Sequence, residues 1–308
     1  MDEQPRAEPG GRLLGGALVA GGAMLFAAKG LFAKKLYALG VGVEALVTIR
    51  ALLSLPLFWA VALARDGTDR IRATRGPAIA AAALAGFACY YVGALLDFQA
   101  LSMIDASIER VLLFSYPAFV VLYLALRQRR RPEAAVLAAV GLTYLGIFLA
   151  VGGFDLAVLR ANFAGALLVI GAALSYAAYF LIGERYTREI GSSLFTLFAM
   201  SAAALALAVH YLVRHGLSGL GGIAPRAWLL LLLIAVVCMF VPASMQAEGV
   251  RRVGAQRGSV ISTIGPPTTI VLSWLLLGER MSGWQIAGVA LIVGGILVLD
   301  ISRRPAAR

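Results

Sequence analysis

Residues 115–131, SYPAFVVLYLALRQRRR, and residues 264–280, IGPPTTIVLSWLLLGER, are the two stretches that decide the fold. They lie 149 residues apart, and each has a proline near its start, then an apolar run, then arginine. The same offset places Cys89 over Cys238. A constant offset between chemically matched segments indicates that the chain contains one structural unit twice.

Composition places both copies in a membrane. The chain has 308 residues, of which 61% are hydrophobic and 14% are charged, whereas soluble domains average about 25% charged residues. A helix needs about 20 apolar residues to cross a bilayer. We expect ten such spans, near 13–33, 43–64, 77–101, 105–126, 134–151, 162–183, 193–213, 227–249, 254–277 and 283–301. The predicted fold class is therefore an all-α integral membrane protein with ten transmembrane helices.

The number of spans in each copy predicts how the copies are oriented. Each copy has five spans, and because five is odd, the second copy enters the membrane from the side opposite the first. Inverted repeats of this kind are a common construction of transporters. The predicted organisation is an N-terminal tail (1–12), a first repeat (13–155), a second repeat (156–301) and a C-terminal tail (302–308).

The distribution of the basic residues that give the net charge of +11 indicates the membrane topology. If the N-terminus is cytoplasmic, 17 basic residues fall in inside segments and 6 in outside loops. That imbalance follows the positive-inside rule, so both termini are expected in the cytoplasm. We expect a multi-pass protein of a prokaryotic inner (plasma) membrane, with the lipid bilayer as its surroundings and no nucleic-acid partner.

Residues 253–288, VGAQRGSVISTIGPPTTIVLSWLLLGERMSGWQIAG, resemble the second EamA repeat of the drug/metabolite transporter superfamily. The first half is similar at Lys34 and Arg50, but it has Arg130-Arg131 in place of the Glu-Arg pair of the second half, and Ala27-Ala28-Lys29 where the family has a Gly-Ser-Asn-like stretch. Within the superfamily the chain resembles the ten-helix, YddG-like exporters of amino acids. The resemblance implies two five-helix EamA repeats around a central cavity.

Charged and aromatic residues inside the spans are the candidates for that cavity. Charged side chains at bilayer depth face a cavity or a partner; here they are Lys29, Arg50, Asp97, Glu109, Arg110, Glu248 and Arg257. Tyr90 lies seven residues from Asp97, and Tyr116 seven from Glu109, so each pair shares a helix face. The predicted substrate-cavity residues are Lys29, Tyr90, Asp97, Glu109, Tyr116, Tyr176, Tyr179 and Gln246, the last being the repeat counterpart of Asp97. The alternative is that the charged members reach out to the lipid headgroups.

Pro117 and Pro266 occupy equivalent positions in the two repeats. A proline inside a helix removes a backbone hydrogen bond and loosens the helix. We predict that both prolines act as hinges of the fourth and ninth spans during alternating access.

The function that these features favour is export of amino acids, aromatic ones included, and of related small metabolites by a secondary transporter. A cavity lined by aromatic rings and a few polar groups suits a small zwitterion or an organic cation. Nucleotide-sugars, sugar phosphates or lipophilic drugs are alternative cargoes, and a membrane-embedded enzyme acting on a lipid-linked substrate is an alternative class. The sequence has no catalytic, phosphate-loop or metal motif, so we expect no enzyme activity, no cofactor, no metal and no ATPase subunit.

Overall fold

The computed structural model describes residues 9–127, 138, 141–142, 144–146, 148–149, 155–216, 222–253 and 261–302. These residues form helices joined by short connections, and none of them is in a β-strand. The first half contains α1 (Pro9–Ala27), α2 (Lys29–Ala38), α3 (Val43–Ala73), α4 (Gly76–Gly86), the π-helix η1 (Phe87–Gly93), α5 (Ala94–Leu101), α6 (Ala106–Leu113) and α7 (Tyr116–Arg127).

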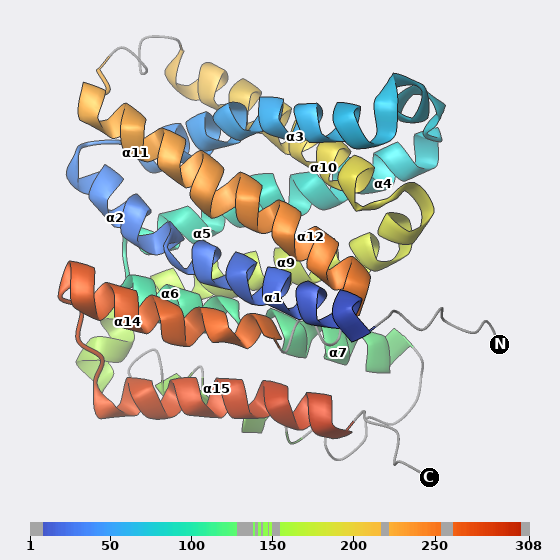
Figure 1. Ribbon diagram of the computed structural model, residues 1–308. Coiled ribbons are helices and arrows are strands. Elements are labelled where there is room, and N and C mark those ends of the chain that lie inside the picture. Colours follow the sequence, from blue (N-terminus) through green and yellow to red (C-terminus); the bar gives the residue numbers. More distant parts are fainter. Residues whose placement is uncertain are drawn as a thin grey trace.

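The second half contains α9 (Leu156–Ile190), α10 (Ser192–His215), α11 (Pro225–Ala235), the π-helix η3 (Val236–Phe240), α12 (Val241–Val253), the 3₁₀ turn η4 (Ser262–Ile264), α14 (Gly265–Leu277) and α15 (Gly283–Ser302). Figure 1 shows α1 beside α12 in the bundle, with α15 along one edge. The first residues of α1 and the last residues of α15 lie at the same end of the bundle (Figure 1).

Length and composition allow six of the helical segments to cross a membrane. They are Leu13–Ala38, Val43–Ala73, Gly76–Leu101, Arg160–Ile190, Ser192–His215 and Pro225–Gly249, and two shorter apolar segments follow at Gly265–Leu277 and Gly283–Gly295. The predicted fifth span, 134–151, lies mostly outside the described residues. Large apolar side chains such as Leu205, Leu229 and Trp274 are exposed on the bundle, as expected for a surface that faces lipid rather than water.

The repeat is visible in the irregular turns of the helices. The π-helices η1 and η3 begin at Phe87 and Val236, which are 149 residues apart. The interruption between α6 and α7 likewise corresponds to η4, because residues 113–115 and 262–264 are related by the same offset. Single π-helical turns are rare and often mark functional positions. Both halves therefore share their distortions as well as their apolar pattern.

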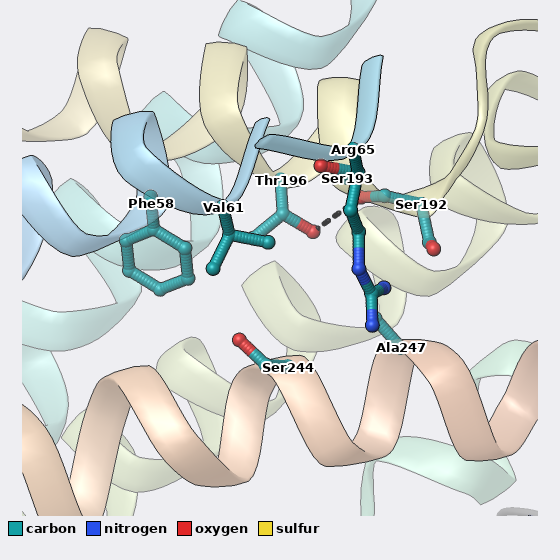
Figure 2. Close-up of a pocket in the computed structure, with 8 residues that line it drawn as sticks. All are labelled: Phe58, Val61, Arg65, Ser192, Ser193, Thr196, Ser244 and Ala247. Carbon is teal, nitrogen blue, oxygen red and sulfur yellow. Dashed lines mark hydrogen bonds between the residues drawn. The ribbon is translucent and has the colours of Figure 1, made fainter. Parts of the chain in front are cut away.

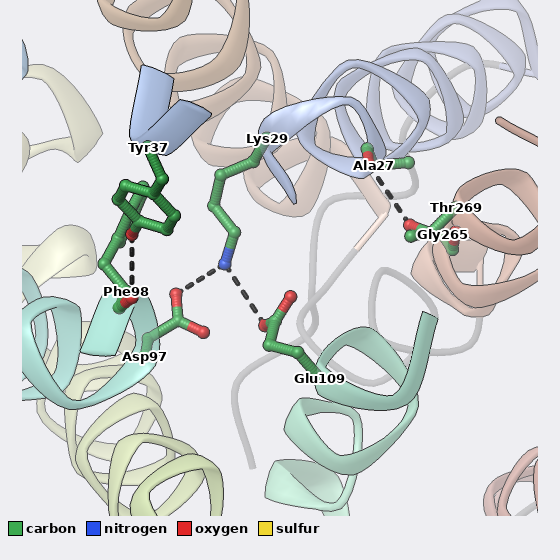
Figure 3. Close-up of polar contacts among 8 residues, drawn as sticks. All are labelled: Ala27, Lys29, Tyr37, Asp97, Phe98, Glu109, Gly265 and Thr269. Carbon is green, nitrogen blue, oxygen red and sulfur yellow. Dashed lines mark hydrogen bonds and ion pairs between the residues drawn. The ribbon is translucent and has the colours of Figure 1, made fainter. Parts of the chain in front are cut away.

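The first span is interrupted between α1 and α2, at Ala28. An interruption leaves backbone groups without their helical partners, and in a membrane these must be satisfied by protein. The hydroxyl of Thr269 in α14 donates a hydrogen bond to the Ala27 carbonyl oxygen at 3.3 Å, and also reaches the Gly265 carbonyl oxygen (Figure 3). Thr269 of the second half thus satisfies a backbone carbonyl group at the break in the first half.

Small residues permit close helix contacts in this bundle. A Cβ atom added to Gly86 of α4 would overlap the backbone carbonyl group of Ala199 in α10. Where α12 meets α1, a Cβ on Gly249 would lie 2.9 Å from the Gly15 carbonyl oxygen. Because lipid tails are as apolar as the side chains, such close packing is what holds membrane helices together.

Candidate functional site

Three charged side chains meet inside the first half, and we call them the ionic cluster: Lys29, Asp97 and Glu109. Lys29 Nζ lies 2.5 Å from Asp97 Oδ2 and 3.3 Å from Glu109 Oε1 (Figure 3). All three residues are at most 3% exposed. The residues come from α2, α5 and α6, so one cation joins three separate helices.

The interruption of the first span places Lys29 at the centre of this cluster. Lys29 is the first residue of α2 and follows directly after the break at Ala28. Burial of an ion is tolerated only where an opposite charge and hydrogen bonds compensate it. The two carboxylates supply that compensation. Their burial is incompatible with the alternative in which these side chains extend to the lipid headgroups.

Arg50 of α3 borders the ionic cluster through an aromatic ring. Its guanidinium carbon lies 4.2 Å from the centre of the Phe98 ring, and Lys29 Nζ lies 5.3 Å from the same centre. The Tyr37 hydroxyl donates a hydrogen bond of 2.7 Å to the Phe98 carbonyl oxygen (Figure 3). A cation over an aromatic face is attracted by the electron density of the ring, so Phe98 helps to hold both cations.

Arg110 of α6 has the same relationship to a second ring. Its guanidinium carbon lies 5.1 Å from the centre of Phe114, whose ring is 5.9 Å from that of Tyr116. Arg110 is 5% exposed and follows Glu109 directly in the chain. Gly265, the first residue of α14, faces it, because a Cβ on Gly265 would lie 3.0 Å from Arg110 Nη2.

Four tyrosines predicted from the sequence form a group beside these cations, which we call the tyrosine group. Its members are Tyr90, Tyr116, Tyr176 and Tyr179. The rings of Tyr90 and Tyr179 contact each other edge to face at 5.2 Å, and those of Tyr116 and Tyr176 lie 6.4 Å apart. Phe180 stacks on Tyr116 at 5.0 Å. Arg50 lies within electrostatic range of Tyr90 and Tyr176, so the charged and aromatic groups adjoin.

For Gln246 the structure shows a contact with α1, and its place in the cavity stays a prediction. Gln246 packs against Gly22, where α12 meets α1. Among the described residues it makes no hydrogen bond or ion pair with Lys29, Asp97 or Glu109. Of the other charged candidates, Glu248 pairs with Arg252 one turn along α12 at 2.7 Å, and Arg257 lies outside the described residues.

Pro117 and Pro266 both follow an interruption rather than standing in the middle of a helix. Pro117 is the second residue of α7, and Pro266 is the second residue of α14. Backbone N–H groups in the first turn of a helix have no acceptor within the helix. A proline there, which lacks an N–H, therefore breaks no helical hydrogen bond. The discontinuities precede the prolines, at residues 114–115 and at η4, so any movement at these sites would start there.

Among the described residues, the buried charged side chains all lie in the first copy of the repeat. At the 149-residue offset, Lys29, Arg50, Asp97, Glu109 and Arg110 correspond to Ala178, Ala199, Gln246, Gly258 and Ser259. Tyr116 corresponds to Gly265, the glycine that makes room for Arg110. The helical framework is therefore duplicated, whereas the buried charges that the described part of the chain shows belong to the first half.

A second polar region lies beside Ser244 and Ala247 of α12. It is a small cavity of about 30 Å³ between α3, α10 and α12, room for about one or two water molecules. Figure 2 shows its lining, Phe58, Val61, Arg65, Ser192, Ser193, Thr196, Ser244 and Ala247. Thr196 donates a hydrogen bond of 2.8 Å to the Ser192 carbonyl oxygen.

A contact between the two halves lies at the start of α6. The Glu279 carboxylate, in the connection after α14, accepts hydrogen bonds from the amides of Ala106 and Ser107 and from the Ser107 hydroxyl, at 3.0–3.3 Å. A carboxylate at a helix N-terminus satisfies free amides and interacts favourably with the helix dipole. Glu279 thereby fixes α6, which carries Glu109 and Arg110.

Sequence reasoning missed several partners in the site. The charged residues were recognisable because ionisable groups are rare within apolar spans. The residues that hold them, Tyr37, Phe98, Phe114, Phe180 and Thr269, are common in membrane helices and carry no separate signal in one sequence. Among the described residues, no group of three histidine, cysteine or acidic side chains could hold a metal ion.

Comparison with known proteins identifies the family. The model of the EamA-like transporter family matches residues 13–152 and again residues 163–300. The chain is 33% identical to the uncharacterized transporter YcbK of Bacillus subtilis (strain 168), over 87% of this chain and 86% of that relative. It is 26% identical to the uncharacterized inner membrane transporter YicL of Salmonella typhimurium, over 66% of this chain and 67% of the relative.

A protein of known crystal structure shares the fold, with a TM-score of 0.65 and 19% identity, over 96% of this chain and 98% of that chain. At this identity the similarity concerns the fold alone. The two family matches fall on the two halves of the repeat and together span most of the chain. The chain belongs to the EamA-like transporter family, and it is a multi-pass membrane transporter built from two repeated halves.

Proposed function

We propose that the protein exports amino acids, aromatic ones included, and related small metabolites across the inner membrane by alternating access, with both termini in the cytoplasm. The observation that carries this proposal is the meeting of buried charges of both signs with the tyrosine group. A zwitterionic amino acid needs a cation for its carboxylate and an anion for its ammonium group. The site contains the basic residues Lys29, Arg50 and Arg110 and the acidic residues Asp97 and Glu109.

Aromatic rings would accommodate the cargo's side chain and ammonium group. Tyr90, Tyr176 and Tyr179 offer apolar ring faces to a side chain, and a ring face also attracts a cation. The distortion of η1 places Tyr90 within the third span. We further propose that Pro117 and Pro266 mark the hinges through which the halves rock, because both follow helix interruptions.

Reconstitution into liposomes tests the proposal directly. Purified protein would be reconstituted into liposomes loaded with labelled phenylalanine, alanine, a sugar phosphate or a nucleotide-sugar, and release would be followed over time. We expect release of an amino acid, and a strong loss of release in Asp97→Asn. Asp69→Asn is the matched control, since Asp69 lies exposed on α3.

Two results would contradict the proposal. Release of the sugar phosphate or the nucleotide-sugar, with neither amino acid released, would assign a different cargo. Equal release by the Asp97→Asn and Asp69→Asn variants would remove the ionic cluster from the transport path.

A further inference from the structure

The buried charges of the site do not balance. Among the described residues, three basic side chains, Lys29, Arg50 and Arg110, are buried here with two acidic ones, Asp97 and Glu109. Lys29 contacts both carboxylates, whereas neither guanidinium has an ion pair with a described residue. An uncompensated charge in an apolar interior is costly. An arriving anion would compensate the excess of basic side chains.

Both guanidiniums also have free hydrogen-bond donors. Nε of Arg50 and Nε of Arg110 are buried without a hydrogen-bond partner among the described residues. Each guanidinium lies over a phenylalanine ring, Phe98 or Phe114. When the flat face of a guanidinium lies over an aromatic ring, the N–H donors at its edge are still available. Their spacing matches the two oxygens of a carboxylate.

The two arginines come from different helices, and both adjoin the ionic cluster: Arg50 lies over the Phe98 ring that Lys29 also approaches, and Arg110 follows Glu109, which pairs with Lys29. Arg50 is on α3 and Arg110 on α6, and both lie within electrostatic range of Tyr176. Arg50 is also within range of Asp97, and Arg110 of Glu109. The backbone of Gly265 in α14 packs closely against Arg110, because a Cβ there would lie 3.0 Å from Arg110 Nη2. Both guanidiniums therefore adjoin the ionic cluster and the tyrosine group.

We propose that Arg50 and Arg110 bind a carboxylate group of the transported molecule, and that this carboxylate, rather than an amino group, is the obligatory recognition element. The proposal rests on the proposed function, because the bound molecule is the exported one. It goes further in predicting that a monocarboxylate without an amino group binds, and that an amino acid with a neutralised carboxylate does not.

Binding to the purified full-length protein in nanodiscs tests this with four probes: phenylalanine, phenylalaninamide, 3-phenylpropionate and inorganic phosphate. We expect phenylalanine and 3-phenylpropionate to bind, and phenylalaninamide to bind at least tenfold more weakly. Arg50→Gln and Arg110→Gln should each weaken 3-phenylpropionate about tenfold to hundredfold, the usual effect of losing a charged hydrogen bond. Arg75→Gln, an exposed position before α4, should bind as the parent does.

Lysine variants keep the test valid if a glutamine variant fails to fold. Arg50→Lys and Arg110→Lys retain the charge but lose the planar fork, so they should bind 3-phenylpropionate with intermediate affinity. The proposal is overturned if 3-phenylpropionate does not bind the parent protein. It is also overturned if phenylalaninamide binds as tightly as phenylalanine, if phosphate binds in place of the carboxylates, or if the arginine variants bind as the parent does.

The two proposals can fail separately. Arginine-dependent binding of 3-phenylpropionate without amino acid release from liposomes would refute amino acid export and support the carboxylate site. Normal amino acid release by Arg50→Lys and Arg110→Lys, with phenylalaninamide released equally well, would support export and refute the carboxylate site.

Discussion

Replacing Lys29 with methionine gives the sharpest test of the ionic cluster. Methionine has a similar length and leaves no gap, so the change removes the charge and little else. Asp97 and Glu109 would then remain 1% exposed without the cation that lies 2.5 Å and 3.3 Å from them.

The size of the effect follows from burial. Removing one partner of a buried ion pair costs about 3–5 kcal/mol, because the remaining charge stays buried and unpaired. Lys29 serves two carboxylates, so we expect the upper part of that range. Neutralising all three members together, as Lys29→Met with Asp97→Asn and Glu109→Gln, leaves no unpaired ion and should recover most of the loss.

The measurement is the free energy of unfolding of purified protein in bicelles, by denaturant titration. Lys35→Met is the matched control, since Lys35 lies exposed on the same helix, and it should change stability by less than about 0.5 kcal/mol. A Lys29→Met protein as stable as Lys35→Met would refute the reasoning. So would a triple variant no more stable than the single one, because the unpaired carboxylates would then not be the source of the cost.

Three other changes test the framework around the site. Glu279→Ala removes the acceptor for the first amides of α6 and should lower the free energy of unfolding by about 0.5–2 kcal/mol, measured by the same titration. Gly86→Ala places a methyl group on the backbone of Ala199, and the forced displacement should cost about 1–3 kcal/mol, also by titration. Pro117→Ala and Pro266→Ala should slow amino acid release from liposomes while leaving binding affinity unchanged.

Each of these three has its own control and opposing result. Glu189→Ala, which removes an exposed carboxylate on α9, should leave the free energy of unfolding unchanged. If Glu189→Ala lowered it as much as Glu279→Ala, the hydrogen bonds from the α6 amides to Glu279 would not be the cause. Gly76→Ala, where an added Cβ meets nothing within 4 Å, should be tolerated, and a Gly86→Ala protein of equal stability would disprove the close contact. Unchanged release by both proline variants would rule out the hinge proposal.

The sequence alone was sufficient for the membrane fold and for most of the charged site. Apolar spans and a constant repeat offset depend on composition and order, which one sequence contains in full. Lys29, Asp97 and Glu109 stood out because an ionisable group within a span has few stable locations. Their mutual contact could not be predicted, because it depends on how α2, α5 and α6 approach one another.

Gln246 shows what the repeat does not decide. Its offset from Asp97 predicts a place in the cavity, and this stays a prediction. The structure shows Gln246 against Gly22, where α12 meets α1. The contacts of Phe98 and Phe114 with the arginines could not be predicted from the sequence, because an aromatic ring in an apolar span has many possible roles.

The two π-helices bear on the history of the chain. A wide helical turn at the same position in both copies is most simply explained if the ancestral unit already had it before duplication, since two separate insertions at one register are a less economical account. The five buried charges have uncharged counterparts, so the copies diverged in chemistry after they were joined. The distortion is then older than the specificity, and relatives with other cargoes are expected to keep the wide turns while differing at Arg50 and Arg110.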